Sequence, residues 1–494
     1  MTRHRNNPVS RKKPFLMKGV SLLGNFALTA ALVLGARDSR ANVALPSVFG
    51  SHMVLQQEKP VRIWGTAQPG QAVTVTLGAS RAVATPNAAG KWEVTFPPLK
   101  AGGAPLTLTA TQGNTVTLND ILVGEVWVCS GQSNMEFCLG KAEHGREEAT
   151  AANHPDLRLL MVPKGMAPTP QANFKGAWAA CTPMSPGTVF AKPFDTPPPG
   201  SNGIGCGGFS AVAYFFGREL QKQLGVPVGL IEASWGGTRI EPWTPPSAPN
   251  SRTIFNSMIA PLQPLGIRGV IWYQGESNAN DGMGYAGKMK TLIGGWRQGF
   301  KQGDFPFYYV QIAPFTFRLG HDTLPVFWEA QASVLSVTNT GMASTQDIGN
   351  LLDIHPTNKL DVGKRLALQA LAKTYGRNVP CSGPTFRQLT PQGESLRVTF
   401  DNAGSGLVSR DGKPLSNFEV IDANGTGWKP AKAEISGTDS VVLSAAGVKH
   451  PVAMRFGWYS GAQPNLSNKE GLPAMTFRAG QPPSLPPPPN AKRS

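Results

Sequence analysis

The chain has 494 residues, of which 40% are hydrophobic, and it contains 56 glycines and 44 prolines. This length predicts two or three domains, and this composition is typical of a globular protein rich in strands and turns, which excludes a coiled coil and a disordered chain. The formal charge is +16, but residues 1–41 hold eight Lys or Arg and one Asp, so the remainder carries 38 basic and 29 acidic residues, a net +9. The basic residues of that remainder are scattered, which favours a solvated surface and argues against nucleic-acid binding.

The first 41 residues have the pattern of an export signal. Six basic residues precede a mostly apolar stretch, 19–36. Ser39-Arg40-Ala41 then places small residues at the positions where a signal peptidase cleaves. We therefore expect residues 1–41 to be a signal peptide and the protein to be exported, to the periplasm or the extracellular space. An uncleaved membrane anchor is the alternative, which polar interruptions in the apolar stretch disfavour. The later sequence predicts no stable membrane span.

Short strands separated by turn signals follow this segment. The expected strands are 61–64, 72–77, 92–96 and 106–110. Strands of this length and spacing, without an amphipathic helix between them, are typical of a β-sandwich. We therefore expect an N-terminal β module over residues 42–118.

From about residue 119 strands alternate with helices. The expected strands are 123–128, 228–233, 269–273 and 307–312, and the expected helices are 210–224, 285–300 and 360–375. This alternation predicts a three-layer α/β/α domain with a mostly parallel sheet over residues 119–380. The catalytic groups of such a domain lie at the carboxyl ends of its strands.

Three further segments differ in composition. Residues 140–208 are rich in proline and glycine and predict an irregular insertion near the mouth of the site. Strand signals return over residues 381–480, which predicts a C-terminal β-sandwich-like region. The proline-rich end, 481–494, is predicted to be disordered.

One serine has an unusual place. The apolar stretch 123–128 stops at the small polar turn 129–135, which presents Ser133 at the end of a buried strand. The turn lacks the second glycine of the G-x-S-x-G elbow, so a nucleophilic Ser133 would belong to a different fold from the α/β-hydrolases. A serine in a turn is more often structural, and the chemistry requires a base and an oxyanion hole from the rest of the chain.

Three other turns carry suitable groups. Gly236-Gly237 follows the strand 228–233, and paired glycines let backbone N–H groups approach a ligand. Gln274 follows the strand 269–273 and has an amide that can donate to an oxyanion. Asp353 and His355 precede the helix 360–375, and residues two apart in an extended segment face the same way. Each turn alone is commonly structural; their joint occurrence supports a serine hydrolase.

The order Ser, Gly-Gly, Gln-Gly-Glu, Asp-x-His resembles the sialate O-acetylesterase family. This family is a branch of the SGNH/GDSL-like hydrolases that also contains bacterial carbohydrate acetylesterases. The resemblance covers about residues 45–478, and the stretches that carry it are 49–56, 130–135, 209–220, 234–238, 272–278, 353–356 and 465–474. It implies an SGNH-type α/β/α domain, a β module before it, and a C-terminal β region packed with that module.

The resemblance also implies roles for the residues of these turns. Ser133 corresponds to the nucleophile, His355 to the general base and Asp353 to the acid that orients it. Many relatives space the acid and histidine as D-x-x-H, so Asp347 is kept as an alternative acid. The implied reaction removes O-acetyl groups from carbohydrates through an acetyl-enzyme, without metal or cofactor.

The implied oxyanion hole uses the backbone N–H of Ser133, that of Gly236 or Gly237, and the side chain of Gln274. Which polar side chain in 274–278 completes it is left open.

The expected partner is an O-acetylated carbohydrate. The predicted substrate contacts are Trp235, Arg239, Glu276 and Asn278, where Trp235 offers a sugar-binding face and Arg239 a cation for the carboxylate of sialic acid. Acetylxylan or another plant polysaccharide is the alternative substrate. The sequence predicts nothing about the oligomeric state.

Two other classes of protein are alternatives to an esterase. One is a non-catalytic carbohydrate-binding protein with a degenerate hydrolase fold. The other is a metal-dependent hydrolase using Asp347, Asp353, His355 and Glu276, whose spacing matches no zinc signature.

Overall fold

The computed structural model describes residues 42–483, apart from 195–196, 199–200, 202, 248–250 and 317–318. The expected signal peptide and residues 484–494 of the expected tail lie outside the described residues. Within the described ranges, no helix combines the length and apolarity that a membrane span requires.

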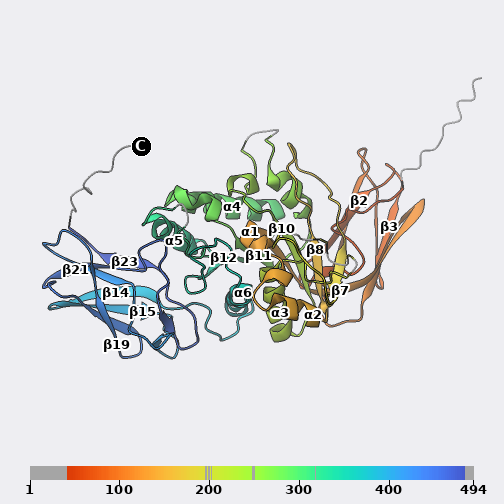
Figure 1. Ribbon diagram of the computed structural model, residues 1–494. Helices are drawn as coiled ribbons and strands as arrows, with labels where there is room; N and C mark the ends of the chain where they lie inside the picture. The colour runs from red at the N-terminus through yellow and green to blue at the C-terminus, as the bar shows by residue number, and fades with distance from the viewer. Residues whose placement is uncertain are drawn as a thin grey trace, which may run out of the picture. The chain divides into compact units, whose positions relative to one another are not determined.

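A mostly parallel sheet forms the centre of the α/β domain (Figure 1). Its main path has the strand order β13-β12-β11-β7-β10-β8-β9, and every pairing along it is parallel except that of β8 with β9. The strands are β7 (Asn114–Gly131), β8 (His154–Met161), β9 (Trp178–Cys181), β10 (Val228–Ser234), β11 (Gly269–Tyr273), β12 (Phe307–Val310) and β13 (Thr340–Ala343). The expected parallel sheet is therefore confirmed.

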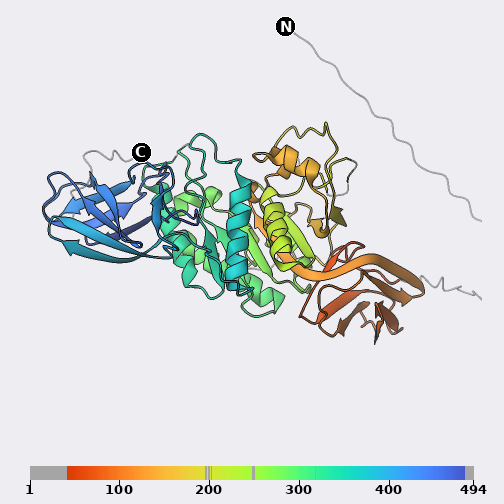
Figure 2. The same cartoon turned by 90° about the horizontal axis from the view of Figure 1, so that it is seen from below.

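Helices cover both faces of this sheet. They are α3 (Ala211–Leu224) and α6 (Lys359–Lys373) on one side, and α4 (Gly284–Phe300) and α5 (Thr323–Ser333) on the other (Figure 1). Figure 2 shows α3 and α6 side by side on the same face of the sheet. Two tryptophans on alternate faces mark the layers: Trp127 of β7 packs on Phe216 of α3 at 5.1 Å between ring centroids, and Trp272 of β11 packs on Trp296 of α4 at 5.9 Å. The three-layer α/β/α prediction is confirmed.

Local signals in the sequence set the ends of these helices. The Ser210 side chain accepts a hydrogen bond from the Ala213 N–H and caps α3, which ends at Gly225 with a left-handed φ of 66°. Asn358 caps α6 by accepting from the Asp361 N–H. Each cap satisfies a backbone group that the helix itself leaves unpaired.

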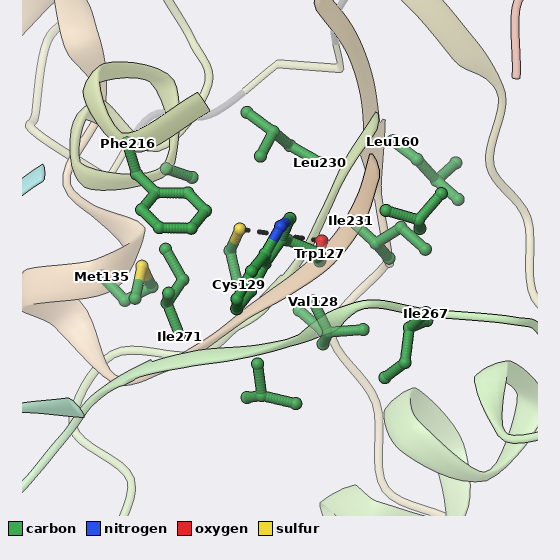
Figure 3. Packing of buried hydrophobic residues seen from close by; sticks show 14 of the residues in the cluster. Trp127, Val128, Cys129, Met135, Leu160, Phe216, Leu230, Ile231, Ile267 and Ile271 are labelled. Carbon is green, nitrogen blue, oxygen red and sulfur yellow. Dashed lines mark hydrogen bonds between the residues drawn. The ribbon is translucent and has the colours of Figure 1, made fainter. Parts of the chain in front are cut away.

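Buried apolar side chains form the core between β7, β11 and α3. Figure 3 shows Ile271 close to Phe216 and Trp127, and all three side chains are buried. Ile271→Val is expected to lower the free energy of unfolding by about 0.5–1.5 kcal/mol, because it removes one buried methyl group. Urea unfolding monitored by tryptophan fluorescence measures this change. The exposed substitution Ile435→Val is the matched control, and equal midpoints for the two variants would contradict the packing.

The N-terminal β module shares a strand with the α/β domain. The first part of β7 pairs antiparallel with β6, and its last part pairs in parallel with β10 and β11. The expected boundary at residue 118 therefore falls inside a continuous strand. The module's other strands are β1 (Val54–Gln56), β2 (Val61–Thr66), β3 (Val73–Leu77), β4 (Ser80–Ala84), β5 (Lys91–Phe96) and β6 (Leu106–Gln112).

Residues 140–208 are more ordered than predicted. They contain α2 (Gly145–Ala151), and they also provide β8 and β9, which extend the central sheet beyond β10. The expectation of a wholly irregular insertion is wrong because the short run 157–160 is buried and completes the sheet.

The C-terminal β region has its own core. Two four-stranded sheets have the orders β14-β15-β20-β19 and β18-β17-β21-β23, and β16 pairs with β22. The strands are β14 (Thr385–Gln392), β15 (Ser395–Asp401), β16 (Leu407–Ser409), β17 (Phe418–Asp422), β18 (Lys429–Pro430), β19 (Lys432–Ser436), β20 (Ser440–Ser444), β21 (Pro451–Phe456), β22 (Leu466–Asn468) and β23 (Phe477–Gly480). Arg478 pairs with Glu329 of α5, and Thr476 accepts from Gln346, so the region joins the α/β domain. This corrects the expected packing against the first β module.

Candidate active site

Ser133 lies where the central strand of the sheet turns into a helix. β7 ends at Gly131, and α1 (Ser133–Glu136) begins two residues later. Gly131 has φ 142°, and a Cβ at this residue would lie 2.1 Å from the Tyr273 carbonyl oxygen, so the close approach of the two strands requires glycine. The turn is fixed further by the Gln132 N–H, which donates to the same carbonyl at 2.9 Å.

The structure brings Ser133, His355 and Asp353 together. His355 Nε2 lies 2.9 Å from Ser133 Oγ, which is a hydrogen-bond distance. On the other side of the imidazole, Nδ1 lies 3.4 Å from Asp353 Oδ1. The same Asp353 oxygen accepts the backbone N–H of His355 at 2.9 Å. A serine, a histidine and a carboxylate are thus aligned so that the imidazole can take the serine proton while the carboxylate orients the ring.

The alternative acid, Asp347, has a different partner. Both of its oxygens accept from the Arg365 guanidinium, at 2.6 and 2.7 Å, and both side chains are buried. A bidentate buried ion pair of this kind holds the carboxylate in place. The geometry therefore favours Asp353 as the group that orients His355.

The surroundings of His355 favour its neutral form. Burial lowers the pKa of the imidazole, and the nearby ammonium of Lys359 lowers it further, while the Asp353 carboxylate opposes both effects. The Phe194 ring contacts the imidazole edge-on at 5.0 Å between centroids and contributes to that burial. A neutral imidazole is the form that can accept the proton of a serine hydroxyl.

A buried polar chain supports the serine and the histidine. The Asn134 amide donates to the Ile354 carbonyl at 2.9 Å and to Glu276 Oε1 at 2.5 Å, and its oxygen accepts from Lys359 Nζ at 2.5 Å. Asn134 thereby ties the loop that carries His355 to the helix that carries Ser133. Burial lowers the pKa of Lys359 to about 7 and raises that of Glu276. Asn134 and Lys359 were not among the predicted site residues.

The paired glycines lie against Ser133. A Cβ at Gly236 would come within 3.2 Å of both Ser133 Cβ and Glu136 Oε2, so this position has no room for a side chain unless its neighbours move. The Gly236 N–H donates to Glu136 Oε2 at 2.6 Å, and Lys164 pairs with the other oxygen of this buried carboxylate. Gly237 follows with a left-handed φ of 72°. Glu136 and Lys164 were also missed; the only sequence signal was the place of Glu136 one turn after Ser133.

Gln274 is a correction to the predicted oxyanion hole. Its side chain is fully buried, and its amide nitrogen donates to Gln132 Oε1, Asn278 Oδ1 and the Thr238 carbonyl at 2.8–3.2 Å. Its own oxygen accepts from the Tyr285 hydroxyl at 2.8 Å. Because these partners use both amide hydrogens, Gln274 holds the turns together and does not point at Ser133.

Two of the predicted substrate contacts are also corrected. Asn278 is buried and bonded to Gln274, to the Ile240 N–H and to Asp281. Arg239 donates to Asp281 and Glu241, so its charge is already matched by carboxylates. Neither residue lies in the wall of the pocket at Ser133.

A pocket of about 440 Å³ opens at Ser133. We call it the Ser133 pocket, and its walls are formed by Gln132, Ser133, Glu136, Lys164, Phe194, Trp235, Gly236, Gly237, Glu276, Ser277, Ile354 and His355. Trp235 and Glu276 therefore lie where substrate contacts were predicted, although one Glu276 oxygen is held by Asn134.

Two residues of the rival metal-dependent mechanism are bonded to other groups. Asp347 is paired with Arg365, and one oxygen of Glu276 accepts a hydrogen bond from Asn134. Across the part of the chain that the structure describes, no group of three or more His, Cys, Asp or Glu side chains is placed to hold a metal ion.

Comparison with known proteins supports the same chemistry. The profile of a family described as carbohydrate esterase, sialic acid-specific acetylesterase, matches residues 123–372, about half of the chain. The chain belongs to this family. It is therefore a carboxylic ester hydrolase, which confirms the resemblance found in the sequence.

Relatives extend the similarity beyond the matched segment. A solved structure, a carbohydrate acetylesterase from Xanthomonas citri, is 36% identical, covers 88% of this chain and 99% of its own, and superposes with a TM-score of 0.81. The sialate O-acetylesterases of Rattus norvegicus and Homo sapiens are each 29% identical, covering 86% and 87% of this chain and 92% and 90% of their own.

Proposed function

We propose that this esterase removes O-acetyl groups from carbohydrates through an acetyl-enzyme formed on Ser133. The observation that carries the proposal is the 2.9 Å contact between Ser133 Oγ and His355 Nε2 in the wall of an open pocket. The activity of the X. citri relative, a carbohydrate acetylesterase, supports the class of substrate.

The proposed reaction has two halves. His355 Nε2 takes the Ser133 proton while Oγ attacks the acetyl carbonyl, and the tetrahedral intermediate collapses as the imidazolium returns that proton to the sugar oxygen that leaves. A water molecule, deprotonated by His355, then attacks the acetyl-enzyme, and Ser133 leaves with the proton to release acetate. Asp353 holds the imidazole in the orientation and tautomer that both halves need.

The oxyanion is proposed to bind to backbone donors. Those of Ser133 and Gly237 are the candidates, because the Gly236 N–H donates to Glu136 and the Gln274 amide is used inside the fold. Preorganised backbone donors of this kind contribute about 10²- to 10³-fold each to kcat. They also require no side-chain rearrangement during the reaction.

The finer substrate and the location are proposals as well. The family description and the rat and human relatives support a sialate O-acetylesterase-like activity, while acetylxylan or another plant polysaccharide is the alternative substrate. The basic and apolar pattern of residues 1–41 supports export to the periplasm or the extracellular space.

A panel of esters tests the proposed function. Acetate release is measured from O-acetylated sialic acid, acetylated xylan, acetylated monosaccharides and p-nitrophenyl acetate. We expect release from p-nitrophenyl acetate and from at least one sugar ester. A protein that binds acetylated sugars without releasing acetate would instead be a carbohydrate-binding module, and the proposal would fail.

The pH dependence of the reaction follows from the surroundings of His355. Because burial and Lys359 lower the pKa of His355, the imidazole stays neutral to lower pH, and the acid limb of kcat/KM is expected below about 6.5, the ordinary histidine value. Lys359→Met is expected to move this limb to higher pH. A pH profile with p-nitrophenyl acetate measures both, and a wild-type limb above 6.5 would contradict the assignment of His355 as the base.

A further inference from the structure

A second cavity adjoins the Ser133 pocket. Its volume is about 660 Å³, within the range that small-molecule sites occupy. The two cavities share three wall residues, Glu136, Lys164 and Phe194, so they meet at the ion pair of the first two. The second cavity therefore lies beside the pocket in which an acetyl group would meet Ser133.

The second cavity is lined by both apolar and polar groups, as ligand-binding sites are. Phe190 and Phe194 provide aromatic surface, and Glu136, Glu232 and Ser234 contribute polar groups to the same wall. Both glutamates are buried, with 1% and 4% of their surface exposed. Aromatic walls with a few buried, directed polar groups are typical of ligand sites, and here the polar groups are ones that exchange hydrogen bonds with hydroxyls.

The protonation of the wall favours hydroxyl binding further. Burial raises the pKa of Glu232 to about 8, and the neighbouring Glu136 carboxylate acts in the same direction. At neutral pH the Glu232 carboxyl group is therefore protonated in most molecules. In this form it can both donate and accept a hydrogen bond. The Ser234 hydroxyl, which donates to Glu232, fixes the orientation of this carboxyl group.

The buried carboxylate of Glu136 in the wall is paired with an ammonium, which suits a neutral sugar. The Lys164 ammonium is matched by Glu136, and Arg239 lies outside both walls and is matched by Asp281 and Glu241. Lys175 is the remaining cation among the described residues of the second cavity, and it is exposed to solvent. The described wall of the second cavity therefore offers a bound carboxylate no buried cation that lacks a partner.

We propose that the second cavity binds neutral, hydroxyl-rich sugar residues of the glycan whose acetyl group is removed at Ser133. This inference rests on the proposed function and narrows its substrate to neutral acetylated glycans. The cavity binds the sugars next to the ester, whereas p-nitrophenyl acetate needs only the Ser133 pocket.

A single filling substitution tests this inference. Ala177 is exposed and lines the second cavity, so Ala177→Trp can fill the cavity without disturbing the core. Ala172 is an exposed alanine of the same loop that lines a different cavity, and Ala172→Trp is the matched control. Each variant and the wild type are assayed with an acetylated xylo-oligosaccharide, O-acetylated sialic acid and p-nitrophenyl acetate.

We expect Ala177→Trp to lower kcat/KM for the acetylated xylo-oligosaccharide at least about tenfold, the effect of losing one ordinary contact of about 1.4 kcal/mol, while p-nitrophenyl acetate is hydrolysed as by the wild type. Ala172→Trp should leave kcat/KM unchanged for both of these substrates. The deacetylated xylo-oligosaccharide should inhibit the hydrolysis of p-nitrophenyl acetate competitively in the wild type and not in Ala177→Trp, which measures binding without turnover.

Three results would overturn the inference. Equal losses on both substrates would show that the tryptophan acts on the Ser133 pocket, and no loss on the oligosaccharide would show that the cavity holds no sugar. A wild type that prefers O-acetylated sialic acid over the neutral oligosaccharide would contradict the neutral class. A wild type that hydrolyses no ester at all would refute the proposed function instead.

Discussion

Ser133→Ala is expected to lower kcat for p-nitrophenyl acetate by about 10⁴- to 10⁶-fold, the range found when the nucleophile of a serine hydrolase is removed. The loss follows from the geometry, because Ser133 Oγ is the atom in contact with His355 Nε2. Stability should change little, since the turn is fixed by Gly131 and by the backbone of Gln132. Activity is measured with purified protein, and folding by urea unfolding.

Ser130→Ala is the matched control for this change. Ser130 lies three residues earlier on β7, is fully buried, and donates its hydroxyl to the Ala233 carbonyl at 2.6 Å. Its loss is expected to cost about 1–3 kcal/mol of stability, because a buried acceptor is left unpaired, and to leave kcat within a few-fold. If Ser133→Ala retained near-normal kcat, Ser133 would not be the nucleophile.

Exchanging each of two aspartates for asparagine is expected to separate catalysis from stability. Asp353→Asn should lower kcat by about 10²- to 10⁴-fold, because the amide cannot stabilise the imidazolium or fix the tautomer of His355. Asp353 is more than half exposed, so the fold should be unaffected. Parallel measurements of kcat and of the urea midpoint report the two effects.

Asp347→Asn should show the opposite behaviour. This change leaves the buried Arg365 without its carboxylate and is expected to cost about 3–5 kcal/mol of stability, while the molecules that remain folded keep near-normal kcat. If the losses were reversed, with catalysis lost at Asp347 and retained at Asp353, the acid of the triad would be wrongly assigned.

The sequence was sufficient to predict the framework of the site. Ser133, Gly236 and the turn at Gln274 each follow a run of buried strand residues, and parallel strands place their carboxyl ends at one edge of the sheet. Asp353 and His355 precede a strongly periodic helix. The positions of these residues at strand and helix ends therefore predict that they converge.

Side-chain directions could not be predicted in the same way. Gln274 and Asn278 lie in the right turn, yet they bond to each other and to Thr238 and Asp281, because the turn packs beneath the pocket. In the sequence, Lys359 resembles an ordinary lysine at the start of a helix. In the structure it is buried and contacts Asn134 and the rings of Phe137 and Tyr273. Tertiary contacts determine the directions of these side chains, and the local sequence pattern does not indicate those contacts.

Among the elements that the sequence did not predict, β8 and α5 were missed for a related reason. β8 has a short apolar run within a segment dominated by proline and glycine, so composition masked its place in the sheet. α5 (Thr323–Ser333) is apolar on most sides and includes Pro325 near its start, so its sequence lacks the amphipathic period of a surface helix. Burial on several sides removes the period on which such predictions depend.

Mass spectrometry of the rapidly quenched enzyme tests the central claim most directly. The protein is mixed with excess p-nitrophenyl acetate, quenched in acid during turnover, and digested. The account predicts one acetyl group on the peptide that carries Ser133, absent from Ser133→Ala and retained in Ser130→Ala. Turnover without an acetylated Ser133 peptide, or with the acetyl group on another residue, would contradict the acetyl-enzyme and the role assigned to Ser133.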